Sequence, residues 1–151
     1  MMTLEHLKLL APKAAQFTPG TGGTPVITFQ EVADALATVS PLASQYARYR
    51  FAGEHSQMRE IRVGLLLMLF GMHQVRKQEM PPGYWTAMID LATMYHAHHE
   101  IFSIRRKARM INRKRWRQID EKNFILIINL LDDSDHELRS ALRAWNEKQF
   151  E

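Results

Sequence analysis

Apolar residues recur along this chain at the spacing of helices that bury one side. Val32, Ala35, Leu36 and Val39 follow one another at intervals of one to three residues, and the stretch 84–102 continues this pattern. A period near 3.6 residues places side chains on one helical face, whereas a half-buried strand alternates every second residue. Signals of strands are nearly absent. The pattern predicts an all-α protein, a single compact helical domain of about six to seven helices.

Local signals predict where the first helices begin and end. A short helix is expected at 3–10, and the Gly- and Pro-rich stretch 18–26 is typical of a loop. Thr28, with glutamate three residues later, forms a capping box for a helix that stops near Thr38. Ser40 is followed by proline, which predicts an N-cap and the first position of the next helix.

The central part of the chain predicts longer helices. Residues 55–77 contain the apolar run 63–72 and are expected to form a buried central helix, closed by the Met-Pro-Pro-Gly sequence at 80–83. The next helix is expected at 84–102. The segment 103–118 is expected to continue as helix.

Two segments are candidates for helix-turn-helix units. At the C-terminal end, helices 122–131 and 135–150 are expected to flank a polar turn, with Ser134 and Glu137 as a second capping box. The second helix would then direct three side chains outward to read DNA: Arg139, Ser140 and Arg143. Residues 31–50 are a weaker candidate, because alanine stands at position 37, where glycine is usual.

The positive charge of the chain is local. The 151 residues hold 20 Lys or Arg and 16 Asp or Glu, and eight of the basic residues lie in the run Arg105–Arg117. The remainder therefore carries 12 basic and 16 acidic residues and is net acidic. Such a local field of one sign favours a polyanionic partner.

The basic run is the main candidate for a binding segment. It contains no acid, and six of its eight basic residues are arginine, which suits bidentate contacts with phosphate or guanine. Arginines at every fourth position from 105 to 117 would form one stripe along a helix. We expect contact with double-stranded DNA through Arg105, Arg106, Lys107, Arg109, Arg113, Lys114, Arg115, Trp116 and Arg117.

Three other interpretations of the run are open. A solvated helix face usually mixes acids with bases, and an acidic protein surface is an alternative partner. A membrane-surface helix would need large apolar residues opposite its charges, but this segment offers only a thin Ile/Ala seam.

Several functional classes lack support in the sequence. The absence of cysteine excludes disulfides, zinc ribbons and thiol nucleophiles. His96 and His99, with Glu100, have a spacing that can chelate a metal from one helix, although no third ligand group stands out, so a helical metal protein is a minor alternative. No catalytic triad, phosphate-binding glycine loop or pair of catalytic carboxylates is recognisable. We expect neither an enzyme nor a cofactor.

Membrane insertion and secretion are not indicated either. The longest apolar run has ten residues, about half of what a bilayer requires, and residues 1–17 lack the uninterrupted apolar core of a signal peptide. We therefore expect a soluble protein of the cytoplasm.

Residues distributed over the N-terminal two-thirds resemble the Q antiterminators of lambdoid bacteriophages in order and rough spacing. They are Leu4, Glu5, Pro12, Lys13, Val32, Ala35, Phe51, Gly53, His55, Leu91, Ala92 and Thr93. The chain departs from the family where lambda-type members insert a cysteine zinc-binding segment, because that place holds the cysteine-free residues 103–118. Because these cysteines are missing, the resemblance does not imply a bound zinc ion.

The resemblance implies a specific activity. Members of the family bind DNA at the late promoter, join RNA polymerase holding its sigma factor at a promoter-proximal pause, and make it resistant to terminators. The resemblance also implies that the protein lies in the cytoplasm of the bacterial host, associated with the nucleoid. A conventional helix-turn-helix transcription regulator is the alternative.

The expected division of the chain follows from its two expected partners, DNA and RNA polymerase. Residues 1–27, the N-terminal helix and the Gly/Pro loop, are not needed to complete a core in this interpretation, and we expect them to contribute to the polymerase contact. Residues 28–151 are expected to form a helical DNA-binding domain.

Overall fold

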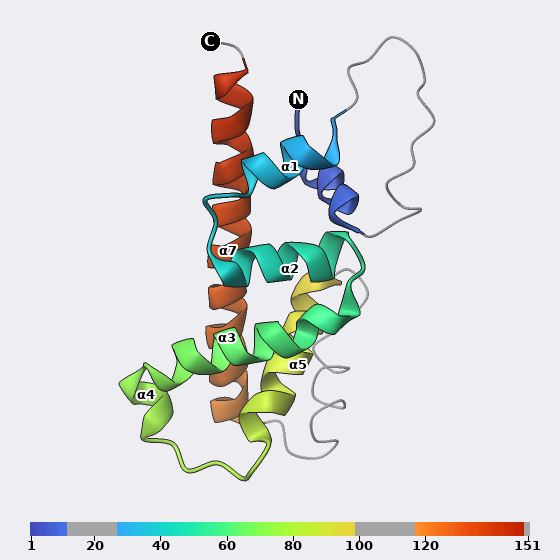
Figure 1. Ribbon diagram of the computed structural model, residues 1–151. Coiled ribbons are helices and arrows are strands. Elements are labelled where there is room, and N and C mark those ends of the chain that lie inside the picture. Colours follow the sequence, from blue (N-terminus) through green and yellow to red (C-terminus); the bar gives the residue numbers. More distant parts are fainter. Residues whose placement is uncertain (12–26, 99–116, 150–151) are drawn as a thin grey trace. The chain divides into compact units, whose positions relative to one another are not determined.

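The computed structural model describes residues 1–11, 27–98 and 117–149 (Figure 1). All regular structure in these residues is helical and they contain no strand, which confirms the all-α prediction. Their contacts form two compact units: unit 1 takes Met1–Met58 and Ser134–Glu151, and unit 2 takes Arg59–Asp133. The boundary expected between residues 27 and 28 remains a prediction, because residues 12–26 lie outside the described ranges.

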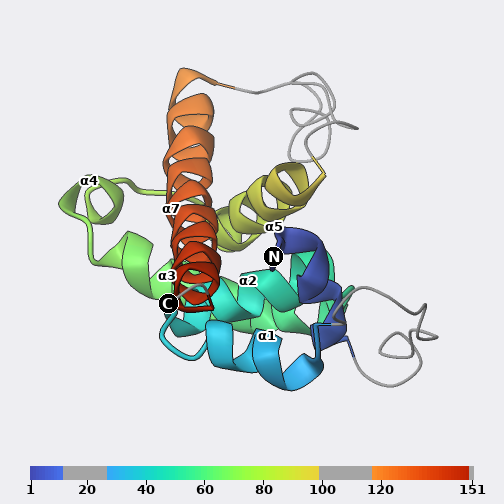
Figure 2. The same cartoon turned by 90° about the horizontal axis from the view of Figure 1, so that it is seen from above.

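Unit 1 is built from short helices packed on the end of a long one. Its elements are the 3-10 helix η1 (Leu4–Leu10), α1 (Phe29–Ala35), α2 (Pro41–Phe51), the 3-10 helix η3 (His55–Gln57) and the C-terminal part of α7 (Gln118–Lys148). Figures 1 and 2 show α1 and α2 lying across this part of α7. Leu138 and Leu142 of α7 belong to the same buried cluster as Val32 of α1 and Ala47 of α2.

The N-caps predicted for α1 and α2 are confirmed, although the Glu31 side chain binds the Thr28 hydroxyl and not the backbone N–H that a complete capping box requires. The Thr28 side chain accepts a hydrogen bond from the Glu31 backbone N–H at 3.3 Å, and the Ser40 side chain accepts one from Ala43 at 3.2 Å. Glu137 of α7 then accepts hydrogen bonds from both the backbone N–H and the hydroxyl of Ser40. The N-terminus of α2 is therefore fixed to α7 as well as capped locally.

The N-terminal helix is part of the core of unit 1. Met2, Leu7 and Leu10 are at most 4% exposed and belong to the buried cluster. Asn146 of α7 holds the segment through two hydrogen bonds, from the Met2 backbone N–H at 2.8 Å and to the Met2 carbonyl at 2.9 Å. The expectation that this helix is not needed to complete a core is therefore wrong.

Unit 2 contains α3 (Met58–Phe70), α4 (His73–Arg76), α5 (Tyr84–Ala97) and the N-terminal part of α7. Only the first residue of α3, Met58, is assigned to unit 1. The guanidinium of Arg62 on α3 donates to both carboxylate oxygens of Asp90 on α5, at 2.6 and 2.7 Å. The rings of Tyr95 and Phe124 connect α5 with α7 at a centroid distance of 5.4 Å.

The expected continuous helix 55–77 is divided into η3, α3 and α4. It breaks after Phe70 at Gly71, and the Arg76 guanidinium donates to the Phe70 carbonyl left at the end of α3. The apolar run is also buried on one side only. Leu65 is fully buried, whereas Leu67 is 73% exposed.

The C-terminal helix pair predicted around the Asp-Asp-Ser-Asp sequence does not form, because residues 118–148 are one α-helix. Ser134, expected to cap a second helix, is buried within α7. The neighbouring acids bind other helices instead of making a turn. Asp135 pairs with Arg50 of α2 at 3.1 Å, and Glu137 binds Ser40. This helix-turn-helix prediction is therefore wrong.

No helix within the described ranges combines the length and apolar character needed to cross a bilayer.

Candidate nucleic-acid interface

Most of the predicted basic segment lies outside the described residues, and only its last member is described. Arg105, Arg106, Lys107, Arg109, Arg113, Lys114, Arg115 and Trp116 lie between the described ranges. Arg117 is the N-cap of α7, since its carbonyl accepts the first helical hydrogen bond, from Glu121 at 3.1 Å. Its side chain is 57% exposed. The structure therefore shows how the basic segment ends.

A buried carboxylate fixes the Arg117 end of the basic segment. Asp120 accepts hydrogen bonds from the Arg117 backbone N–H at 2.9 Å and from its guanidinium at 3.3 Å. An acid at the third helical position that bonds back to the N-cap N–H is half of a capping box, and its charge also complements the helix dipole. The position of Arg117 is therefore fixed by local hydrogen bonds at the N-terminus of α7.

The same carboxylate is part of a hydrogen-bond network across unit 2. The Tyr84 hydroxyl donates to Asp120 at 2.6 Å and accepts from the Asn123 amide at 3.1 Å. Asn123 in turn exchanges two hydrogen bonds with the Gln78 amide, at 2.8 and 3.0 Å. The network connects the start of α7 to the start of α5 and to the segment after α4.

The network changes the acidity of two groups. Burial, followed by the hydrogen bond to Asp120, raises the pKa of Tyr84 well above its ordinary value. Burial alone would raise the pKa of Asp120 too, but the hydrogen bonds from Tyr84 and Arg117 outweigh it and lower that pKa. Asp120 is therefore a carboxylate at neutral pH.

A groove of about 410 Å³ lies beside the network in unit 2. Lys77, after α4, and Lys122, on α7, line it together with apolar side chains that include Ile119 and Ile125. Both lysines are exposed, and among the described residues neither has a carboxylate within ion-pair distance. Two ammonium groups without an ion pair among the described residues can contact the phosphate oxygens of a nucleic acid.

Sequence reasoning did not identify Lys77 and Lys122. They are 45 residues apart, and only the packing of the segment after α4 on the first turns of α7 brings them to one groove. A local signal did exist for the network, because an aspartate three residues after Arg117 is typical of a helix start.

The other predicted DNA-contacting residues lie in unit 1. Arg139, Ser140 and Arg143 are exposed on α7, as expected, but on an uninterrupted helix and not on the second helix of a turn unit. Arg139 is already paired with Asp135, at 3.1 Å. The helix-turn-helix geometry that would let these three side chains read a major groove is therefore absent.

The helix pair α1 and α2 does form, at the weaker helix-turn-helix candidate. Pro41 is the only exposed residue of α2, and Arg48 and Arg50 on this helix pair with Glu54 and Asp135. A recognition helix must present free polar side chains to base edges. Helix α2 instead packs into unit 1.

The histidine cluster considered as a metal site is described in part. His96 is buried, and its Nε2 lies 2.6 Å from a carboxylate oxygen of Asp132 on α7. His99 and Glu100 lie outside the described ranges. Within the described part of the chain, no group of three potential ligands is arranged to hold a metal ion.

Comparison of the chain with protein-family models, with curated proteins and with solved structures finds no match.

Proposed function

We propose that this protein is a DNA-binding transcription antitermination factor that contacts DNA mainly through phosphates. The observation that carries the proposal is the acid-free run of eight Lys or Arg, which ends at Arg117. Asp120 holds that end in unit 2, where Lys77 and Lys122 line a groove and have no ion pair among the described residues. The basic run and the groove together form the proposed interface.

The chemistry of these groups favours phosphate contact over base reading. The ammonium groups of Lys77 and Lys122 bind phosphate as flexible point charges, whereas the Arg117 guanidinium can bind either a phosphate or a guanine bidentately. Neither helix-turn-helix candidate is available to read bases, since α7 contains no turn and α2 is packed into unit 1. Binding dominated by phosphates is sensitive to salt and permits movement along DNA.

The antitermination step rests on the resemblance to the lambdoid Q family. A factor that leaves its DNA site to travel with RNA polymerase benefits from such salt-sensitive binding. The net acidic remainder of the chain is consistent with a second, protein partner, because acids near a DNA-only surface repel phosphate. RNA polymerase with its sigma factor is that partner in this proposal.

The salt dependence of DNA binding tests the interface. If about four to six phosphates are bound, log K should fall against log salt with a slope of about −4 to −5. Replacing Arg109, Arg113 and Arg117 with alanine should make the slope less steep by about one for each phosphate that is no longer bound, and should weaken binding to all DNA sequences similarly.

A matched control uses another basic residue of unit 2. Arg59 is exposed on α3 and has no ion pair among the described residues, so Arg59→Ala removes one charge without touching the interface. Lys77→Ala and Lys122→Ala should each flatten the slope, and Arg59→Ala should not. Unchanged binding in the triple variant would refute the interface.

A further inference from the structure

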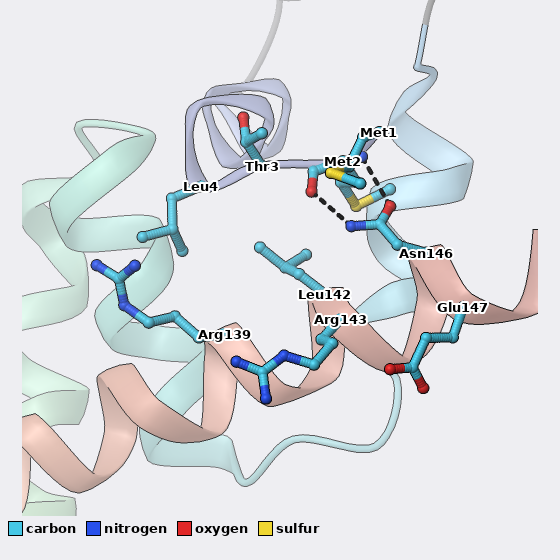
Figure 3. A pocket seen from close by; sticks show the side chains of 9 residues that line it. All are labelled: Met1, Met2, Thr3, Leu4, Arg139, Leu142, Arg143, Asn146 and Glu147. Atoms are coloured by element: carbon cyan, nitrogen blue, oxygen red, sulfur yellow. Dashed lines mark hydrogen bonds between the residues drawn. The ribbon is translucent and has the colours of Figure 1, made fainter.

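A second groove, of about 540 Å³, lies within unit 1 between the N-terminal segment and α7 (Figure 3). Leu4 and Leu142 reach into it from its two sides, and the side chain of Met1 lies at one end. Arg139 and Arg143 extend from the α7 side. The groove thus combines an apolar floor with a rim that carries two arginines and, further along α7, Glu147.

The walls of this groove are held in place. The Asn146 side chain binds the Met2 backbone through the two hydrogen bonds described above, which Figure 3 shows as dashed lines. Met2 is 2% exposed and Leu142 is 4% exposed, so both anchor their segments in the core. A preformed groove binds a ligand without the entropic cost of ordering its own walls.

The charges along the rim have a fixed order. Arg139, Arg143 and Glu147 are spaced four residues apart on α7 and therefore follow one another on one side of the helix. Asp135 takes one hydrogen bond from Arg139, whereas Arg143 has no ion pair within the described part of the chain. A complementary ligand carries negative charge near Arg143 and none near Glu147.

We propose that this groove binds a short segment of a partner protein in which an apolar side chain lies next to Asp or Glu. The apolar residue would fill the space between Leu4 and Leu142, and the carboxylate would pair with Arg143, which can bind it bidentately. Double-stranded DNA fits this surface poorly, because its phosphate chain gains little from an apolar floor and is repelled by Glu147. This site is separate from the proposed DNA interface and does not depend on it.

A selection from displayed peptides tests the proposal directly. Full-length protein is used to select from random peptides of about twelve residues, and the enriched peptides are synthesised and titrated by fluorescence anisotropy. Peptides that pair an apolar residue with an acid should be enriched. Arg143→Glu should weaken their binding at least about tenfold, and Arg59→Glu, at an exposed arginine of unit 2, should not.

The position of binding and the alternative occupants are tested in parallel. Methyl NMR signals of Leu4 and Leu142 should shift when an enriched peptide is added. Enrichment without acidic residues, or equal binding to the Arg143→Glu variant, overturns the proposal. So does a loss of DNA binding in Arg143→Glu as large as that in Lys122→Glu, which would assign the groove to nucleic acid. A concentration-dependent dimer that Arg143→Glu abolishes would assign it to a second copy of this chain.

Discussion

Replacing Asp120 with asparagine tests the network that fixes the end of the basic segment. Asp120 is 4% exposed and accepts hydrogen bonds from the Tyr84 hydroxyl and from the backbone and guanidinium of Arg117. The amide oxygen of asparagine can still accept from Tyr84, but its NH2 group faces the Arg117 donors. The variant therefore loses the charge and the bonds to Arg117.

The expected cost follows from the kind of bond that is removed. Hydrogen bonds to a charged group contribute about 1.5–3 kcal/mol each, and a buried donor left without an acceptor adds its own cost. Arg117 is partly exposed, so water replaces some of the stabilisation that its guanidinium loses. We expect Asp120→Asn to lower the free energy of unfolding by about 1.5–3 kcal/mol at neutral pH.

The pH dependence has a defined sign. The native pKa of Asp120 is lowered, so its contribution is complete above the unfolded value of about 3.9 and is lost as the pH falls through the native pKa. The stability difference between wild type and Asp120→Asn should therefore be constant from about pH 8 to 5 and shrink below about pH 4.

Urea unfolding followed by circular dichroism measures both quantities. Asp133→Asn is the matched control, because Asp133 is exposed on the same helix and forms no ion pair among the described residues. It should change stability by less than about 0.5 kcal/mol. An Asp120→Asn variant as stable as wild type at pH 7, or a difference that grows in acid, would refute the reasoning.

Three further predictions use the same unfolding measurement. Leu65→Ala should cost about 2–5 kcal/mol and Leu67→Ala less than about 0.5 kcal/mol, because the first is fully buried and the second is 73% exposed; equal costs would contradict the one-sided burial of α3. Glu137→Ala should cost about 1–3 kcal/mol by freeing the two donors of Ser40, and a neutral result would exclude this contact. Deleting residues 1–10 should destabilise unit 1, because Leu7 is removed from its core. A deletion variant as stable as the full-length protein would mean that the N-terminal helix is not needed to complete this core.

The parts of the fold that the sequence predicted correctly depend on neighbours in the chain. Thr28 and Ser40 cap helices through bonds to residues three positions later, so no knowledge of the tertiary structure was needed. The absence of alternating patterns likewise excluded strands correctly for the described residues.

The prediction of a turn in the C-terminal helix is wrong because two local rules disagree. Asp and Ser disfavour helix interiors, which suggested a turn at the acidic sequence before His136. The buried series Ile127, Leu131, Ser134, Leu138 and Leu142 nevertheless keeps helical spacing through that sequence, and the helix 118–148 contains neither Gly nor Pro. Bonds from its acids to α2 and α5 then stabilise the continuous helix.

The errors concerning the N-terminal helix and α3 have a different physical origin. Whether Leu7 or Leu67 is buried depends on which elements pack against it, and periodicity does not identify those elements. The same limit applies to the site. The basic run is visible in the sequence, but Lys77 and Lys122 share a groove only in the folded unit.

Terminator readthrough in a purified transcription reaction tests the proposed function most directly. The template carries the DNA that flanks this gene, followed by a terminator, and is transcribed by bacterial RNA polymerase with its sigma factor. At concentrations that saturate the DNA site, the protein should increase readthrough, and the Arg109, Arg113 and Arg117 triple alanine variant should not. Unchanged termination with the full-length protein would contradict the antitermination proposal and leave a conventional DNA-binding regulator in its place.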